Sequence, residues 1–555
     1  MGWERTMLLV ALSTMLPLLA GEFDEIEKKI DVCTLDNGLR VILYRRGDAP
    51  VVSCITYVKT GSVDEVVGST GIAHQLEHLA FKGTASIGTR DFASEQRLFA
   101  EIDKRYDDLL ALQAELPSHA RTALLEILAK LSSGGDHAAP DKIKEHTTVL
   151  RARWAKDGVK LDDARFAQLI ELMNGWAARV QEADRFVIHN HYANVIGCAG
   201  GAGLNAFTSN DRTVYLVSLP ANQIELWAAL ESDRYMNTVP RQLEKEKQVV
   251  LEERRMRTET RAFGKLYEAF DNMAFAAHPY GVAVIGHRSD ILNYTREKIL
   301  NFYRTHYTPR NTIVVLVGRF DVEKTRELLK QYFSKIPAVP APAEPVTVEP
   351  KQTGERRVDV EFPAQPILLM GFHIPERKHP DTPALKVLAD LASDGRSSRF
   401  YTALVKTRRA HTVSTWLGPG ERYPRLWVAS AEPSEESTLE KLEEDVCLEI
   451  ERLRSVAPTA DELKRVIASY RMGVLKTLQD NMGLAIELAD YEALAGDWRG
   501  LFREIEAISA VQPEHVIAAA QKYLTRSNRT VARLISTEEP ESPQVLGVPA
   551  SPPKE

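Results

Sequence analysis

The sequence contains few cysteines and no closely spaced cysteine pair. Its four cysteines are Cys33, Cys54, Cys198 and Cys447, and none lies in a C-x-x-C arrangement. They are too sparse to cross-link a chain of 555 residues, so the fold is expected to depend on packing. A bridge between Cys33 and Cys54, which lie on neighbouring predicted strands, is the one disulfide left open. Neither Gly21 nor Glu22, directly after the N-terminal apolar segment, is the cysteine that a lipid anchor would need.

The sequence also lacks an excess of basic residues and long apolar runs. Lys and Arg total 70 against 77 Asp and Glu, which gives a net charge of -7. Nucleic-acid binding needs clustered basic residues that replace phosphate counterions, so no nucleic-acid partner is expected. After the N-terminal segment, no apolar run approaches the roughly 18 residues that cross a bilayer, so no transmembrane segment is expected in the mature chain.

Residues 1–20 have the layout of a secretory signal. They carry an Arg near the start, an apolar run from Met7 to Leu19, and small residues at Ala20 and Gly21. This order is typical of a cleaved signal peptide and predicts a periplasmic or secreted protein. A short N-terminal helix or anchor is the alternative.

A proline-rich stretch divides the rest of the chain. Residues 337–354 begin with PAVPAPAEPVTVEP, a composition that favours extended backbone and predicts a linker. An N-terminal part, 22–336, precedes it and a C-terminal part, 355–538, follows it. Residues 539–555 are expected to form a disordered tail.

The two parts end alike. FYRTHYTPRNTIVVLVG (302–318) and AAQKYLTRSNRTVARLIS (519–536) each combine a helical pattern, a Tyr, an Asn and a β-branched strand. Pairing Tyr307 with Tyr523 suggests an internal repeat, although two helix-to-strand junctions can also be similar by chance. Strand and helix patterns mix in both parts, so the predicted fold class is α+β.

Residues 93–188 differ from their surroundings. Apolar residues recur at three- and four-residue steps, beginning with Leu98, Ile102, Leu109, Leu112 and Leu116. This pattern predicts long amphipathic helices that form an inserted arm. A self-packed helical hairpin is favoured over an arm that binds a partner.

The stretch HQLEH carries the strongest chemical pattern. His74, Glu77 and His78 share one face if the segment is helical. Two imidazoles four residues apart can hold one zinc ion, and the carboxylate between them lies close to the ion. The alternative is a polar stripe on an ordinary helix.

A catalytic zinc needs a further protein ligand, and EKEKQVVLEERRM (244–256) offers one. Glu246 and Glu253 are seven residues apart and therefore share a helix face. Glu253 could bind the metal while Glu246 supports a ligand or a water. A solvated helix with ordinary ion pairs is the alternative.

Together these two segments resemble the pitrilysin or insulinase family of zinc peptidases with the inverted HxxEH motif, which includes mitochondrial processing peptidases. The supporting motifs are LDNGLRVILY (35–44), HLAFKGT (78–84), GLNAFTSNDRTVY (203–215), HPYGVAVIGHRSDI (278–291), YTPRNTIVVLVG (307–318) and, more faintly, ASDGRSSRFY (392–401). The resemblance implies two homologous α/β-sandwich halves and one zinc ion.

The resemblance also implies roles for individual residues. His74, His78 and Glu253 become zinc ligands, Glu77 the general base and Glu246 a support for the ligands. Glu252 is the rival ligand, but it lies about 100° around the helix from Glu253. Asn205 and Ala206 would lie on the edge strand that receives an extended peptide, although the segment could equally be an ordinary sheet strand.

Two departures from the family pattern stand out. The arm at 93–188 increases the number of residues between the histidines and Glu253 in the sequence, which adds little to the entropy cost of closing the loop. Val405 and Thr412 occupy positions where active relatives place an Arg and a Tyr that hold substrate.

The sequence therefore predicts a zinc metalloendopeptidase for peptides or unfolded chains, helped by a homologous partner subunit in a homo- or heterodimer. A non-catalytic scaffold subunit of the same fold is the alternative.

Overall fold

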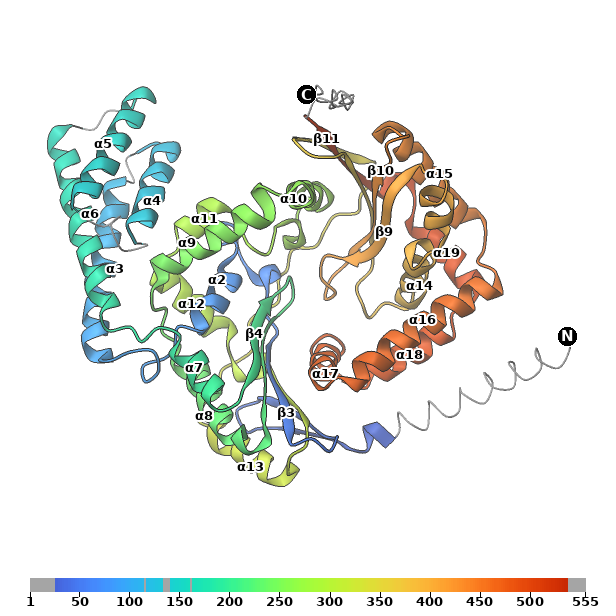
Figure 1. Ribbon diagram of the computed structural model, residues 1–555, viewed down its shortest axis with the longest axis horizontal. Coiled ribbons are helices and arrows are strands. Elements are labelled where there is room, and N and C mark those ends of the chain that lie inside the picture. Colours follow the sequence, from blue (N-terminus) through green and yellow to red (C-terminus); the bar gives the residue numbers. More distant parts are fainter. Residues whose placement is uncertain (1–24, 114–115, 133–139, 160–161, 538–555) are drawn as a thin grey trace, which may run out of the picture.

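The computed structural model describes residues 25–113, 116–132, 140–159 and 162–537 (Figure 1). The expected signal peptide (1–20) and tail (539–555) lie outside the described residues. No helix in the described ranges has the length and apolar character needed to span a membrane.

The first half is built on a mixed six-stranded sheet. The order is β1 (Ile30–Thr34), β2 (Arg40–Arg45), β6 (Thr312–Gly318), β3 (Val51–Val58), β5 (Thr213–Pro220) and β4 (Ala202–Thr208). β2 runs parallel to β6, and β3 lies antiparallel between β6 and β5. Every residue of β6 is buried, as expected for a strand covered on both faces.

Most helices of this half pack on one face of the sheet or beside it. They are α2 (Ile72–Ala80), α7 (His191–Cys198), α8 (Ile224–Asn237), α9 (Leu243–Arg254), α11 (Arg288–Leu292), α12 (Arg296–His306) and α13 (Val322–Phe333). α10 (Ala262–Ala274) instead points toward the second half (Figure 1).

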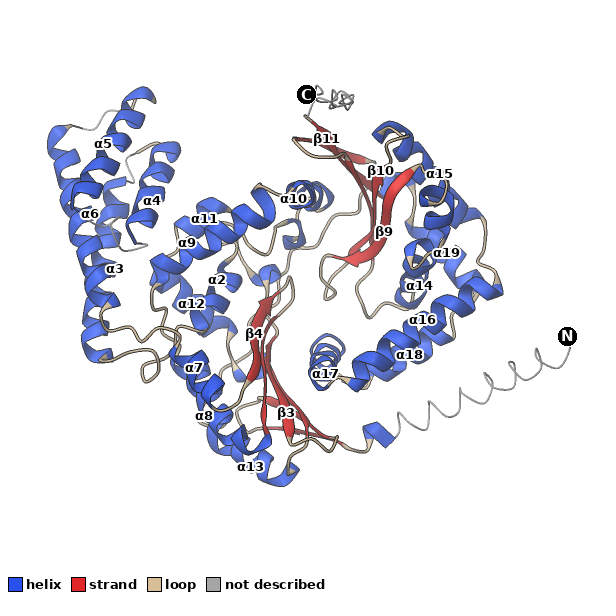
Figure 2. Cartoon of the chain, viewed as in Figure 1, coloured by secondary structure: helices blue, strands red, loops and turns tan. Residues whose placement is uncertain are grey.

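The second half repeats this plan with five strands. Their order is β7 (Arg356–Phe362), β11 (Arg529–Ser536), β8 (Ile367–Ile374), β10 (Arg425–Pro433) and β9 (Ala410–Gly418). Its helices are α14 (Thr382–Ser393), α15 (Leu439–Ser455), α16 (Ala460–Gln479), α17 (Asn481–Ala495), α18 (Gly500–Ser509) and α19 (Pro513–Tyr523). Figure 2 shows both sheets with their flanking helices. The expected α+β fold of two similar halves is confirmed.

The repeat is visible in detail at the two helix-to-strand junctions. The Asn311 amide donates to the backbone oxygen of His306 at 2.9 Å, and the Asn528 amide donates to that of Tyr523 at 2.8 Å. Each acceptor is the last residue of its helix, α12 or α19. The two asparagines are therefore equivalent, but Tyr523 corresponds to His306 rather than to Tyr307.

The two halves exchange one helix each. α10 of the first half packs its apolar residues, including Leu266 and Phe270, against β7, β8 and β11 of the second sheet. α17 of the second half packs Leu484 and Leu488 against β3 and β6 of the first sheet. Each sheet is thus a layer between its own helices and a helix from the other half.

The proline-rich stretch connects α13 to β7 without helix or strand between residues 337 and 355. One part of it is tied down. The Glu349 carboxylate accepts hydrogen bonds of 2.9–3.0 Å from the backbone N–H groups of Ala276, Ala277 and His278. The linker therefore crosses from one half to the other along the end of α10. The exact domain boundaries remain a prediction.

The arm consists of four helices rather than a hairpin (Figure 1). They are α3 (Phe92–Gln113), α4 (Ser118–Ser132), α5 (Pro140–Lys156) and α6 (Asp163–Asp184). Trp154 and Trp176 are buried among them. The arm also packs on the body, because α4 contacts α9 and the Tyr106 hydroxyl of α3 donates to the Leu292 carbonyl at 3.1 Å.

The disulfide considered from the sequence is wrong. Cys33 lies on β1 and Cys54 on β3, and both are free. β2 and β6 lie between these strands, which separates them by about 14 Å, whereas a disulfide needs Cα atoms within about 7 Å.

Candidate metal centre

Helix α2 carries His74, Glu77 and His78 beside β4, the edge strand of the first sheet. The helix begins after Gly71, whose φ of 85° is in the left-handed region that favours glycine. The buried Glu65 carboxylate accepts a hydrogen bond of 2.6 Å from the Gly71 N–H. A carboxylate at a helix N-terminus stabilises it, so Glu65 helps to fix where α2 starts.

Three ligand atoms from α2 and α9 converge. Glu253 Oε2 lies 3.7 Å from His74 Nε2 and 3.4 Å from His78 Nε2. One ligand atom from each residue lies within 4.8 Å of the other two. Two atoms bound tetrahedrally to one zinc ion at about 2.0–2.1 Å are about 3.3–3.4 Å apart. The two carboxylate–imidazole distances are close to this value, so these two imidazoles and one carboxylate could together hold a zinc ion.

Glu246 lies behind His78. Its Oε2 is 3.6 Å from His78 Nδ1, and its Oε1 is 2.6 Å from Lys82 Nζ. A carboxylate beside the second imidazole nitrogen fixes the ring and makes it a better ligand. Glu246 is therefore placed where it could orient the His78 ring. Lys82, which sequence analysis did not single out, in turn holds Glu246.

The geometry distinguishes Glu253 from its rival Glu252. Glu252 is half exposed and pairs with Arg255 at 2.6 Å. Glu253 Oε1 pairs with Arg257 Nη1 at 2.8 Å, which leaves Oε2 to face the histidines. Arg257 belongs to a π-helical turn, Arg255–Glu259, and such turns recur at functional sites.

The two histidines differ in their electrostatics. Burial, followed by the nearby His78, lowers the pKa of His74 to about 4. Burial also acts to lower the pKa of His78, but neighbouring carboxylates, Glu246 first, outweigh it and raise this pKa to about 9. Because a metal binds neutral imidazole, a cation held here would have to displace a proton from His78.

Glu77 lies beside the three candidate ligands and is 8% exposed. Burial is the largest influence on its carboxyl and raises its pKa, whereas a hydrogen bond from Thr208 opposes that shift. The Thr208 hydroxyl donates to Glu77 Oε2 at 2.6 Å. A carboxylate with a raised pKa at such a position can take up a proton and give it back.

Asn205 and Ala206 lie on β4, at the edge of the first sheet. They pair with Leu216 and Tyr215 of β5, and Asn205 is exposed. α2 contacts β4, so the unpaired edge of this strand runs past the helix that bears the histidines (Figure 1). An extended chain added to β4 would therefore pass the candidate metal centre.

In the second half, the corresponding helix α14 and edge strand β9 are joined by hydrogen bonds. α14 contacts β9 as α2 contacts β4, but α14 contains neither His nor Glu. Ser393 Oγ accepts a hydrogen bond of 2.8 Å from the Thr415 N–H, and the Thr415 hydroxyl donates to the Ala389 carbonyl at 2.7 Å. Among the residues that the structure describes, the single cluster able to hold a metal is that of the first half.

Val405 and Thr412 also belong to the second half. Val405 ends a π-helical turn, and Thr412 is exposed on β9. The nearby arginines are engaged elsewhere, because Arg408 pairs with Glu436 at 3.1 Å and Arg409 with Asp445 at 3.2 Å. The two arginines that follow Val405 most closely in the sequence are thus both in ion pairs.

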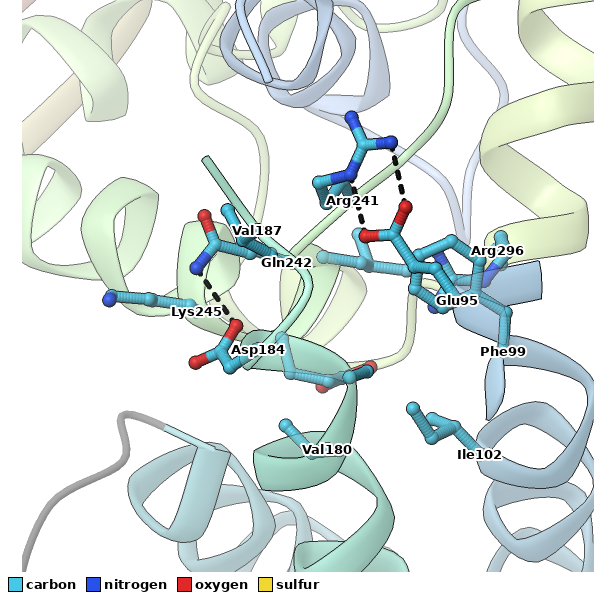
Figure 3. A pocket seen from close by; sticks show the side chains of 13 residues that line it. Glu95, Phe99, Ile102, Val180, Asp184, Val187, Arg241, Gln242, Lys245 and Arg296 are labelled. Atoms are coloured by element: carbon cyan, nitrogen blue, oxygen red, sulfur yellow. Dashed lines mark hydrogen bonds and ion pairs between the residues drawn. The ribbon is translucent and has the colours of Figure 1, made fainter. Parts of the chain in front are cut away.

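The root of the arm supports the metal centre through a buried ion pair. Arg241 and Glu95 are both fully buried and form a bidentate pair at 2.6 and 2.8 Å (Figure 3). Arg241 also donates to the backbone oxygens of Lys82 and Thr84 at 2.8 and 3.0 Å. It thus connects the arm, the loop after α2 and the start of α9.

Glu95→Leu is expected to destabilise the protein by roughly 3–5 kcal/mol, because it leaves the Arg241 guanidinium buried without its partner. Thermal unfolding monitored by circular dichroism measures the loss. Glu101→Leu is the matched control on the same helix, since Glu101 pairs with Arg179 at 3.3 Å on the surface, where such a pair contributes about 0–1 kcal/mol. Equal midpoints for the two variants would contradict the structural role of Arg241.

Comparisons with known proteins match both halves. Residues 40–104 match the family model "Insulinase (Peptidase family M16)", and residues 293–470 match "Peptidase M16 inactive domain". The chain is 29% identical over 344 residues to the zinc protease PqqE of Helicobacter pylori, which covers 60% of this chain and 76% of that one. It is 23% identical over 344 residues to the mitochondrial-processing peptidase subunit beta of Lentinula edodes, covering 58% and 72%.

Solved structures give the same fold. The crystal structure of a protease from Helicobacter pylori superposes with a TM-score of 0.69 at 23% identity and covers 91% of this chain and 99% of that one. A putative M16-like peptidase from Alicyclobacillus acidocaldarius gives 0.63 at 18% identity, with 92% and 98% covered. The matches to the two M16 family models confirm that the chain is similar to the insulinase (peptidase M16) family.

Proposed function

We propose that this protein is a zinc-dependent metalloendopeptidase that hydrolyses peptides or unfolded polypeptide segments. The convergence of His74, His78 and Glu253 on one point, with Glu77 beside them, carries the proposal. One zinc ion held there would polarise the scissile carbonyl and acidify a water molecule.

The other steps belong to the side chains of the chain itself. Glu77 takes a proton from the attacking water and passes it to the leaving amine. Glu246 keeps the His78 ring in place, and Arg257 holds the second oxygen of Glu253. Hydrolysis of a quenched peptide that stops with a chelator and returns with zinc tests the activity.

The substrate is proposed to add to β4 as a further strand. Main-chain hydrogen bonds to an exposed edge hold an extended peptide of any sequence, and neighbouring side chains supply the preference. Asn205 and Ala206 are the proposed contacts. This mode favours peptides and unfolded segments over folded proteins, because only an extended chain can pair with the edge.

A homologous partner subunit is proposed to complete the substrate contacts. Val405 and Thr412 cannot donate hydrogen bonds as an Arg and a Tyr would. We therefore expect the isolated chain to cleave peptides slowly and a copurified related chain to raise kcat/KM, in a homodimer or a heterodimer. Assays of the homogeneous chain with and without the copurified protein measure this. Full activity of the isolated monomer would remove the need for a partner.

A scaffold subunit without activity remains the second candidate. The match of residues 293–470 to a model named for an inactive domain favours this role for the second half. The complete ligand set in the first half favours catalysis. Zinc content together with peptide turnover separates the two candidates, since a scaffold would show no turnover even when loaded with zinc.

The apolar segment at residues 1–20 supports a periplasmic or secreted location. Cell fractionation, with N-terminal sequencing of the mature protein, tests it. A mature N-terminus near Gly21 in the extracytoplasmic fraction is the expected result, and a cytoplasmic chain that retains Met1 would contradict it.

A further inference from the structure

Thr208 is the group that fixes the orientation of Glu77. Its hydroxyl donates to Glu77 Oε2 at 2.6 Å, and no other hydrogen bond to this carboxylate is found in the described part of the chain. The cross-strand neighbour Thr213 uses its own hydroxyl to donate to the Thr60 carbonyl at 2.9 Å. Thr208 is also the last residue of β4, so the strand proposed to receive substrate ends at the base.

The turn after Thr208, residues 209–212, is held first by the loop that precedes α2. The N–H groups of Ser62 and Val63 donate to the carbonyls of Ser209 and Asn210 at 3.1 and 2.9 Å. Gly61 allows this approach, because a Cβ at that position would lie 2.2 Å from the Ser209 oxygen. The turn is therefore closely packed against its own half.

The second half holds the same turn through two side chains. Asp211 Oδ2 accepts hydrogen bonds from the backbone N–H groups of Glu421 at 2.6 Å and Arg422 at 3.2 Å. These residues belong to the connection between β9 and β10. Arg212 forms an ion pair with Asp490 of α17. Asp211 and Asp490 are both nearly fully buried, so these contacts are shielded from water.

Tyr280 completes the anchor. Its hydroxyl donates to Asp211 Oδ1 and accepts from the N–H of Arg422 at 3.2 Å. The buried Asp211 carboxylate thus connects the loop after α10, the 209–212 turn and the second half. Because the turn begins one residue after Thr208, any displacement of Asp211 is passed along the backbone to the hydroxyl that holds Glu77.

We propose that Thr208 and Asp211 are positioning residues through which the second half acts on the reaction. The second half has no metal-binding cluster in its described residues. Its contribution is to hold the 209–212 turn so that Thr208 aims the Glu77 carboxylate. This inference rests on the proposed peptidase function and adds a role for the half that lacks catalytic groups.

The first test compares Thr208→Val, which keeps the shape without the hydroxyl, with Thr208→Ser, which keeps the hydroxyl. We expect Thr208→Val to lower kcat roughly 10- to 100-fold, the effect of losing a hydrogen bond to a charged group, with KM nearly unchanged. Thr208→Ser should restore most of kcat. For both variants, the metal-free protein is titrated with zinc in competition with a chromophoric chelator, and the zinc Kd should equal that of the wild type. Equal kcat for the Val variant and the wild type would overturn the proposal.

The second test asks whether Asp211 acts through Thr208. Asp211→Asn should lower kcat, and the double variant with Thr208→Val should lose little more than Thr208→Val alone, because both changes affect one path. Tyr280→Phe is a milder change to the same anchor and should lower kcat in the same direction. The proposed action of Asp211 through Thr208 would be wrong if the losses in kcat of the two single variants added fully in the double variant. It would also be wrong if Asp211→Asn lowered thermal stability but left kcat unchanged.

The matched control breaks a different contact between the halves. Arg40 of β2 pairs with Glu492 of α17 at 2.7 Å, a contact that involves no residue of the 209–212 turn. Glu492→Gln should leave kcat unchanged. If it lowered kcat as much as Asp211→Asn does, weakening any contact between the halves would be enough to lower activity, and the specific role of Asp211 and Thr208 would be contradicted. Wild-type protein without peptidase activity would refute the proposed function, whereas active wild type with an unaffected Thr208→Val variant refutes only this inference.

Discussion

Glu77→Gln is expected to retain zinc and to lose peptide turnover by roughly 10²- to 10⁴-fold, the range for removal of a general base. The amide has nearly the same shape and can still accept from the Thr208 hydroxyl, but it cannot take up a proton. The three ligand atoms belong to other residues, so metal binding should persist. Turnover of a quenched peptide and zinc content by atomic absorption measure the two effects on one preparation.

Glu252→Gln is the matched control for this variant. Glu252 is a half-exposed glutamate on α9, next to the ligand but turned away from it and paired with Arg255. Its substitution should change neither zinc content nor turnover. If Glu77→Gln were as active as the wild type, the assigned mechanism would have to be abandoned.

His78→Ala is expected to lose both zinc and activity, because it removes one of three protein ligands from a site in which the remaining two cannot hold the ion tightly. The imidazole also lies 3.6 Å from Glu246 and 3.4 Å from Glu253, so its removal leaves two carboxylates without their shared partner. Zinc content after dialysis and peptide turnover are the measurements.

Glu246→Gln provides a graded comparison with His78→Ala. It leaves all three ligands in place and weakens only the support of the His78 ring, so the zinc Kd should rise by roughly 10- to 100-fold rather than binding being lost. Turnover should recover when zinc is added in excess. A His78→Ala protein that stays fully loaded with zinc would show that the ion binds elsewhere.

The proposed metal ligands could be anticipated because helical periodicity is a local rule. Spacings of four residues between His74 and His78 and of seven between Glu246 and Glu253 put each pair on one helix face, and the family resemblance joins the two segments. The groups that refine the site follow no such rule. Thr208 is 131 positions from Glu77 in the sequence, and the two meet only because β4 passes α2.

The fold shows the same division between local and long-range information. Alternating strands and the similar endings at 302–318 and 519–536 indicate two related halves. They do not indicate which strands are neighbours. Cys33 and Cys54 were expected on adjacent strands, but β6, which comes from a distant part of the sequence, and β2 both lie between them. Amphipathic patterns likewise do not reveal which sheet α10 or α17 covers.

The exchange of α10 and α17 limits how this molecule can move. A hinge motion at residues 337–355 that separated the two sheets would remove α17 from the first sheet and α10 from the second. Buried apolar residues of both sheets would then be exposed to water. Burial of that area opposes such a motion. Packing across the two halves therefore favours their movement as one piece. If the proposed partner subunit is present, an entrance for the proposed substrate would have to open between the two chains rather than within this one.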